Sequence, residues 1–221
     1  MRTRKAVVIE PRDQSRIAAA LERWPEAEGF VGWRTRAFVY LLWDGALRTG
    51  AAIWLNIEEV AREASGRIQV AQQAVLRPSE GNRYRGREVV MSDRARDAIA
   101  DYLKFARAEG WLAKASRLKG PLWISTQPQG EQKRMSQRTA VQAWHSFIGS
   151  VKGLSSDEHQ LDDIVLTGRV EFLQAAKSTD VMSEHAGISP KWAGHYSDHF
   201  TTRSSTRAVI SQLNQKYKRG R

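Results

Sequence analysis

The sequence contains no cysteine, which excludes both a disulfide framework and a thiolate metal site. It also lacks a long uncharged apolar run. Residues 1–30 mix basic and acidic side chains without an apolar core segment, so we expect neither a secretory leader nor a membrane span. Internal repeats and low-complexity segments are missing too. These absences predict a cytoplasmic protein that needs no membrane, metal or other cofactor.

The sequence has fewer acidic than basic residues. The chain has 35 Lys and Arg against 24 Asp and Glu, a formal net charge of +11, and a sequence pI of about 10.2. The charges are clustered: residues 201–221 hold six basic residues and no acid, whereas residues 157–184 hold seven acids against two basic residues. Clustered positive charge suits a polyanion whose binding releases counterions. We therefore predict double-stranded DNA as the partner, with a merely solubilising basic surface as the alternative.

Apolar residues make up 41% of the 221 positions, enough to bury the core of one compact domain. Helical spacing, capping residues and terminating Pro or Gly indicate helices over residues 13–24, 34–47, 51–55, 92–107, 136–151, 164–176, 180–186, 190–195 and 203–216. Short β-rich runs around the turn at 78–82 indicate a small antiparallel sheet between residues 67 and 91. The predicted fold class is mainly α with a small antiparallel β-sheet (α+β).

The domain organisation follows from this order of elements. We expect an N-terminal extension over residues 1–12, one folded domain over residues 13–200, and a basic C-terminal helix and tail over residues 201–221. The tail is expected to dock on a neighbouring protomer in a homo-oligomer or to lie on phosphates, with a solvated, disordered end as the alternative.

The first functional motif is the turn that ends the second apolar helix, Gly45-Ala46-Leu47-Arg48-Thr49-Gly50. With the order of elements, it resembles the catalytic domain of the tyrosine recombinases, the phage-integrase family, over residues 12–217. The resemblance implies that Arg48 grips the scissile phosphate. A guanidinium suits this role because it binds phosphate oxygens through two donors and stabilises transition-state charge. Alternatively, Arg48 neutralises the C-terminal carbonyls of its helix.

The second motif lies near the C-terminus, where Ala186-Gly187-Ile188-Ser189 precedes His195-Tyr196-Ser197. The resemblance implies that Tyr196 is the nucleophile, because a tyrosine can form a covalent phosphotyrosyl intermediate. An ordinary packing tyrosine is the alternative. Ile188 stands where the family has a histidine.

The third motif departs from the family, which has His-x-x-Arg where this chain has His159-Gln160-Leu161-Asp162. His159 matches, but Asp162 replaces an arginine that binds phosphate. An acid there repels the phosphate, and we expect Asp163 to add to the repulsion. Thr167 falls where the family often has a threonine. Arg169 is a candidate for a displaced second arginine.

The family's sheet lysine, a general acid, also has no counterpart, since residues 66–91 contain only arginines among the basic residues. An arginine hardly deprotonates and is a poor proton donor. Loss of several cooperating groups predicts strongly impaired cleavage. The basic residues that we expect to bind DNA are Arg48, Arg77, Arg83, Arg85, Arg87, Lys133, Arg134, Arg138, Arg203 and Arg207.

Three functions stay open. The favoured one is a DNA-binding protein with a tyrosine-recombinase fold and a degenerate site, in a regulatory or accessory role on a mobile element. The second is an active recombinase or integrase that uses Tyr196, Arg48, His159 and Arg169. The third is a helical transcription regulator outside the family. We do not expect a metal site at His185, His195 and His199, because the sequence lacks a glutamate in His-Glu-x-x-His spacing.

Overall fold

A computed structural model of the chain describes residues 5–65, 67–76, 87–112, 118–126, 133–176, 178–186 and 214–215. Within these ranges the fold is mostly helical, with two small antiparallel sheets, which confirms the predicted class. The elements in chain order are α1 (Pro11–Gly45), α2 (Thr49–Ile53), α3 (Ile57–Val60), β1 (Ala61–Ala64), β2 (Arg67–Val70), β3 (Gln73–Leu76), β4 (Arg87–Val90), α4 (Asp93–Ala108), α5 (Gln137–Ser150), α6 (Leu161–Ala176) and α7 (Thr179–Ala186).

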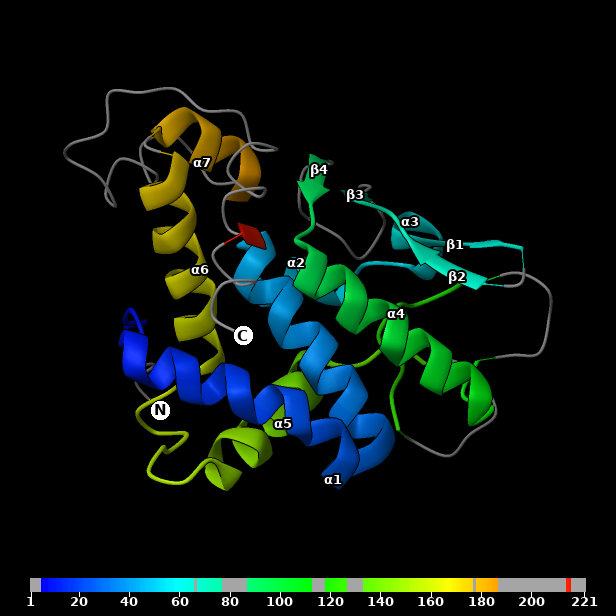
Figure 1. The fold of residues 1–221 in the computed structure, drawn as a ribbon, viewed down its shortest axis with the longest axis horizontal. Coiled ribbons are helices and arrows are strands. Elements are labelled where there is room, and N and C mark those ends of the chain that lie inside the picture. The colour runs from blue at the N-terminus through cyan, green and yellow to red at the C-terminus, as the bar shows by residue number, and fades with distance from the viewer. Residues whose placement is uncertain are drawn as a thin grey trace.

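Helix α1 consists of two helical arms joined at a sharp kink (Figure 1). The bend lies at Gly29, whose φ of 53° and ψ of −127° are strained for any residue with a Cβ. The sequence predicted two separate helices with Pro25 beyond the end of the first. The prediction of two helices is confirmed, since the kink at Gly29 separates the arms, but the boundary was wrong, because the first arm continues through Pro25, which is buried inside it. The two arms meet there: a Cβ on Gly32 would lie 2.8 Å from the Pro25 Cα.

The strands form two hairpin sheets. Strand β3 pairs with β4, with Ala74 opposite Val89, as the predicted sheet requires. Strand β2, however, pairs with β1, which the sequence analysis did not predict. Helix α3 is also new, and its capping box joins Asn56 to Glu59. The stretch from residue 56 to 64 is short and rich in Glu, so its local pattern resembles neither a helix nor a strand.

Two helices begin at the predicted caps. The Ser92 side chain accepts a hydrogen bond from the Ala95 backbone at the start of α4, and Ser136 accepts one from the Thr139 backbone at the start of α5. Such caps satisfy backbone donors that have no partner within the helix. The chemistry of helix starts therefore fixed both boundaries correctly.

An N-terminal segment, residues 5–10, lies along α6. The Val7 backbone donates to Asp163 Oδ1 at 2.8 Å, and the Ile9 backbone donates to Thr167 Oγ1 at 2.9 Å. Ile9 is buried, whereas Val7 and Val8 are exposed. The segment is thus held by polar groups of α6 and by a single apolar side chain.

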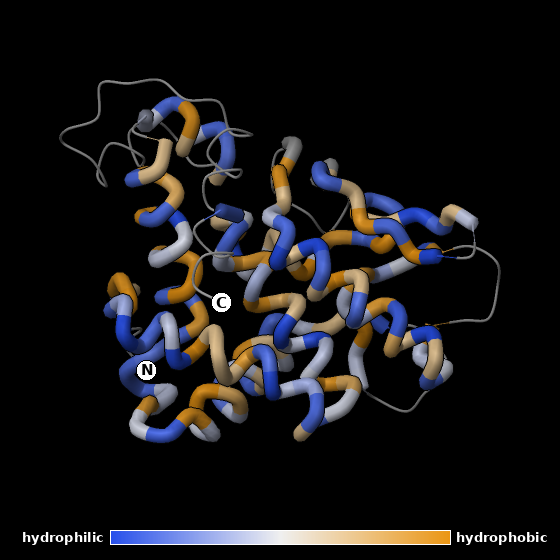
Figure 2. Tube along the Cα trace, in the orientation of Figure 1, coloured by the Kyte–Doolittle hydropathy of each residue, from blue (hydrophilic) through white to orange (hydrophobic). Residues whose placement is uncertain are grey.

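The core lies between the second arm of α1 and the elements around it. In Figure 1, α6 and α7 stand on one side of this arm, and the strands stand on the other, beyond α4. Figure 2 shows apolar and polar positions alternating along the helices, as expected when one side of each helix faces the core. A smaller apolar cluster joins α6, α7, Ala46 and Val90. No helix in the described part of the chain is both long and apolar enough to cross a membrane.

Candidate nucleic-acid interface

Arg48 lies between α1 and α2, at the N-cap position of α2, and it is exposed. Ala46, two residues earlier, is fully buried and adopts the left-handed conformation with a φ of 50°. A residue with a Cβ pays about 1–2 kcal/mol for this conformation, so the surrounding structure must hold the turn. The turn therefore presents the Arg48 side chain to solvent from a buried and constrained backbone.

A buried ion pair braces the end of α1 just before this turn. The Asp44 carboxylate is fully buried and accepts hydrogen bonds from the Ser92 hydroxyl and from both Nε and Nη2 of Arg94. The Arg94 guanidinium also lies over the rings of Tyr40 and Trp43, at 4.4 and 5.0 Å from their centroids. Because the two charges are paired and the guanidinium is stacked on aromatic rings, this cluster joins α1 firmly to the start of α4.

Arg169 of α6 comes close to the same turn. Its Nε lies 3.4 Å from the backbone carbonyl of Ala46, two residues before Arg48. Arg169 and Arg48 are 121 positions apart in the sequence, yet the fold brings them to one loop. The carbonyls that end α1 carry partial negative charge, which a guanidinium neutralises. This contact is the role that the sequence analysis considered for Arg48 as an alternative.

Both ring nitrogens of His159 lie close to protein oxygens, one in its own loop and one on α1. Its Nδ1 lies 3.3 Å from the Ser155 carbonyl and its Nε2 lies 3.5 Å from an oxygen of Asp13. The His159 backbone carbonyl accepts a 2.7 Å hydrogen bond from the Trp144 indole. In the described structure these contacts hold the imidazole against protein groups.

The adjacent acids Asp162 and Asp163 have different surroundings. Asp162 is exposed in the first turn of α6. Asp163 is fully buried and accepts hydrogen bonds from the Val7 and Gln160 backbones, at 2.8 and 2.7 Å. The expectation that Asp163 adds to phosphate repulsion is therefore corrected: its carboxylate is enclosed by these donors and caps the helix. Asp162 is the acid that solvent reaches.

The predicted DNA-binding residues of the described ranges differ in their contacts. Lys133 and Arg138 are exposed. Arg134 instead donates hydrogen bonds to the carbonyls of Ile53 and Leu55, at 2.8 and 2.9 Å, and to Asn56 Oδ1 at 2.6 Å. Burial lowers the pKa of the Arg134 guanidinium, and the nearby acids of α3 oppose this shift. Arg134 thus joins the end of α2 to α3, leaving Lys133 and Arg138 as the available cations here.

Several predicted site residues lie outside the described part of the chain, namely Tyr196, Ile188, Arg77, Arg83, Arg85, Arg203 and Arg207, together with the side chain of Arg87. The C-terminal tail lies outside it as well, apart from residues 214–215. Asn214 Oδ1 accepts a 3.0 Å hydrogen bond from the Asp93 backbone at the start of α4. Among the described residues, no group of three metal-ligating side chains occurs.

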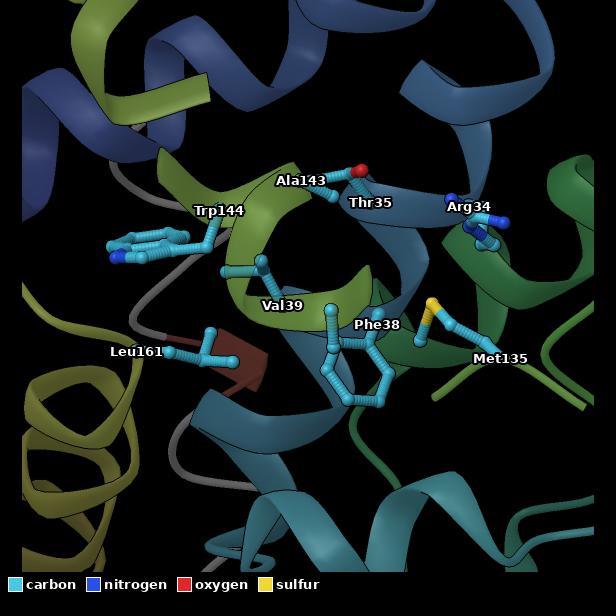
Figure 3. A pocket seen from close by; sticks show the side chains of 9 residues that line it. Arg34, Thr35, Phe38, Val39, Met135, Ala143, Trp144 and Leu161 are labelled. Atoms are coloured by element: carbon cyan, nitrogen blue, oxygen red, sulfur yellow. The ribbon is translucent and has the colours of Figure 1, made fainter. Parts of the chain in front are cut away.

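A small hollow lies between α1 and α5, and Met135 and Leu161 also border it (Figure 3). Its lining is apolar apart from Arg34 and Thr35, both buried. Arg34 donates from Nη1 to the Ile124 carbonyl at 2.5 Å and lies over the Phe30 ring, and burial lowers its pKa. None of the residues predicted to bind DNA lines this hollow.

The buried groups that support the Arg48 turn were not predicted from the sequence. Asp44 and Arg94 look like ordinary surface charges in the sequence. His185 was considered only as a member of the metal site that we did not expect. One signal was available: Asp44 directly follows the apolar run of residues 37–43 and precedes the Gly45 turn. A charge in that setting calls for a buried partner.

Comparisons with known proteins show the fold. No family model matches the sequence, and no curated protein matches it. Solved structures do match: the XerA recombinase at 15% identity and a TM-score of 0.62, covering 99% of this chain and 66% of that one. The XerH site-specific recombinase bound to its difH substrate matches at 14% identity and a TM-score of 0.63, covering 98% of this chain and 55% of that one.

The Tn1549 transposon integrase in complex with transposon right-end DNA is also similar, at 13% identity and a TM-score of 0.60, covering 97% of this chain and 67% of that one. This chain therefore spans between about half and two thirds of the length of these structures. At such low identity the similarity shows the fold alone. The predicted tyrosine-recombinase fold is confirmed.

Proposed function

We propose that this chain, which has the fold of the tyrosine recombinases, binds double-stranded DNA and has lost most or all of the strand-cleavage chemistry. It would then serve as a regulatory or accessory DNA-binding protein on a mobile element. The observation that carries this proposal is that two site positions are both exposed: Arg48, on a strongly braced turn, and Asp162, at the start of α6. The first residue suits phosphate binding and the second opposes it.

Charge supports the binding half of the proposal. The net charge is +11, and the exposed Arg48, Lys133 and Arg138 are available to phosphates. Each phosphate that a cation neutralises releases counterions, so affinity should fall steeply with salt. The XerH and Tn1549 structures contain DNA on the same fold. Phosphate contacts of this kind hold DNA whether or not a strand is cleaved.

The chemistry of the missing groups supports the other half. Removing one charge-stabilising donor costs about 2.7–4 kcal/mol of barrier, a factor of about 10² to 10³. Asp162 goes further, because it places a negative charge where the resemblance implies a positive one. The His159 ring is also held by Ser155 and Asp13. We infer that the three groups left for cleavage, Arg48, His159 and Tyr196, act too weakly together.

An active recombinase is the second candidate, and the position of Arg169 favours it. The Arg169 Nε reaches the Ala46 carbonyl, so its guanidinium lies next to the Arg48 turn. In this alternative, Arg169 supplies the second positive charge and Tyr196 attacks the phosphate. The covalent protein–DNA link would then form without the histidine expected at Ile188.

A nicked DNA substrate separates the two candidates, because loss of the nicked fragment traps any covalent Tyr196 adduct. We expect a shifted band in a native gel, no covalent species in a denaturing gel, and the same result for Tyr196→Phe. A covalent band that disappears in Tyr196→Phe would establish the active recombinase. DNA flanking the chain's own gene is the first substrate to test.

A salt titration tests binding independently of cleavage. For six phosphate contacts, affinity should fall by about 10³-fold between about 50 and 200 mM salt. An affinity that does not change over this range would overturn the proposed phosphate contact.

A further inference from the structure

The turn before Arg48 begins where α1 ends, and the end of a helix leaves backbone carbonyls without partners inside the helix. Helix α1 itself has no basic residue in its last turn. Its terminal carbonyls therefore depend on donors from other elements. Arg169 of α6 supplies one such donor to Ala46.

Helix α7 supplies another donor through His185. The His185 Nε2 lies 3.3 Å from the backbone carbonyl of Asp44, four residues before Arg48. Since a carbonyl can only accept, Nε2 must carry the proton and donate. The imidazole is buried, with 1% of the residue exposed. A buried donor at a helix end is positioned to fix the path of the chain that follows.

The His185 ring is itself held in place. It stacks on Phe172 of α6, with the ring centroids 3.9 Å apart and the planes 11° from parallel. Met182, one turn earlier on α7, is buried in the same small apolar cluster as Phe172. His185 therefore combines two separable contacts, a ring stack that joins α7 to α6 and a hydrogen bond that joins α7 to the Arg48 turn.

Two residues of the turn region show why this hydrogen bond matters. The Asp44 side chain is already fixed by Ser92 and Arg94, so His185 adds a restraint on the Asp44 backbone. Ala46 follows in the strained left-handed conformation. A strained turn relaxes when its supports are removed, and Arg48, two residues after Ala46, would move with it.

We propose that His185 is a positioning residue for DNA binding, which holds the Arg48 turn in its binding conformation through the Asp44 carbonyl. The proposal rests on the proposed function, in which Arg48 contacts DNA. Through this hydrogen bond, α7 contacts the backbone immediately before the proposed phosphate-binding turn. The bond joins residues 141 positions apart in the sequence.

Two substitutions separate the hydrogen bond from the ring stack. His185→Phe keeps an aromatic ring against Phe172 but cannot donate to Asp44. His185→Gln keeps a donor but loses the ring. We expect His185→Phe to weaken DNA binding about two- to tenfold, the range for loss of one hydrogen bond. We expect His185→Gln to bind DNA within about twofold of the unmodified chain.

A double-mutant cycle with Arg48→Met shows whether His185 acts through Arg48. In the Arg48→Met background, His185→Phe should cause no further loss of affinity. Met182→Ala is the matched control, because it loosens the same part of α7 without touching the Asp44 carbonyl; its loss of DNA affinity should be small and independent of Arg48. Independent losses for His185→Phe and Arg48→Met, or an equal and equally coupled loss for Met182→Ala, would overturn the proposal.

Hydrogen exchange of the free protein tests the positioning without DNA. The Ala52 amide, which donates to the Arg48 carbonyl at 3.0 Å, should exchange faster in His185→Phe than in His185→Gln or Met182→Ala. Unchanged exchange in His185→Phe would overturn the positioning role. A different result would separate the two proposals. If Arg48→Met binds DNA normally, the proposed DNA contact of Arg48 is wrong. If His185→Phe still accelerates the exchange in that case, His185 nevertheless supports the Arg48 turn.

Discussion

Gly168 of α6 lies directly against the backbone carbonyl of Trp43 in α1, so close that a Cβ at position 168 would overlap the Trp43 oxygen. This approach sets the distance between the two helices immediately before the Arg48 turn. The Trp43 indole also donates to Glu171 on the next turn of α6, at 3.0 Å. Together these contacts fix α6, and with it Arg169, against the end of α1.

Gly168→Ala should destabilise the protein by about 3 kcal/mol or more, because the added methyl group meets a backbone atom that cannot rotate away. Urea denaturation measures the loss. Gly149→Ala is the control, since its Cβ would point into open space at an exposed position of α5. That substitution should stabilise the protein by about 0.5–1 kcal/mol. Equal effects at both positions would contradict the close packing of α1 and α6.

Asp162→Arg should tighten DNA binding, since it changes an exposed negative charge into a positive one at the position where the resemblance implies an arginine. The salt dependence of binding should steepen by about one phosphate contact. Covalent cleavage should stay low, because the sheet lysine is still missing. Glu26→Arg makes the same charge change at an exposed position on the first arm of α1. If Glu26→Arg tightens binding equally, the gain reflects net charge and not the position of Asp162.

Asp163→Ala should cost about 2 kcal/mol of stability, because it removes the acceptor for the Val7 and Gln160 backbones. The N-terminal segment, residues 5–10, should become sensitive to protease as well. Asp162→Ala, one residue away but exposed, should change stability by less than about 0.5 kcal/mol. A larger loss of stability in Asp162→Ala than in Asp163→Ala would show that Asp162, and not Asp163, caps the helix.

Arg134→Gln should affect the stability of the protein, whereas Arg138→Gln should affect its binding to DNA. Arg134→Gln breaks hydrogen bonds to two backbone carbonyls and should lower stability by about 2–3 kcal/mol. Arg138→Gln should leave stability unchanged while reducing the salt slope of DNA binding by about one. A stable Arg134→Gln protein with a reduced slope would instead place Arg134 on the DNA.

Tyr102 gives a prediction at alkaline pH. Burial raises the pKa of its phenol to about 12, against an ordinary value of 10.0. A pKa that is raised in the folded state contributes stability below pH 10 that is lost as the pH rises towards 12. The loss from Tyr102 should reach about 2–3 kcal/mol. Tyr102→Phe should flatten this part of the stability curve, and an unchanged slope would show that the phenol is not responsible.

The sequence by itself determined the features that depend on neighbouring residues. The apolar spacing of α4 and the caps at Ser92 and Ser136 gave correct helices, because capping and amphipathic patterning act within one or two turns. The Gly45–Arg48 turn and the recombinase-like order of elements led to the correct fold. Pro25 led to a wrong helix end, because proline usually terminates a helix. Here the packing of the two α1 arms keeps the chain helical through Pro25.

Only the tertiary structure decided what the polar residues do. Asp162 and Asp163 are neighbours of the same type, and which of them is buried depends on the docking of residues 5–10 against α6. Arg134 reads as one more surface cation until its hydrogen bonds are known. Arg169 and His185 reach the end of α1 across 123 and 141 positions of sequence. Periodicity and capping are local properties, whereas the supports of the Arg48 turn come from helices that meet only when the chain has folded.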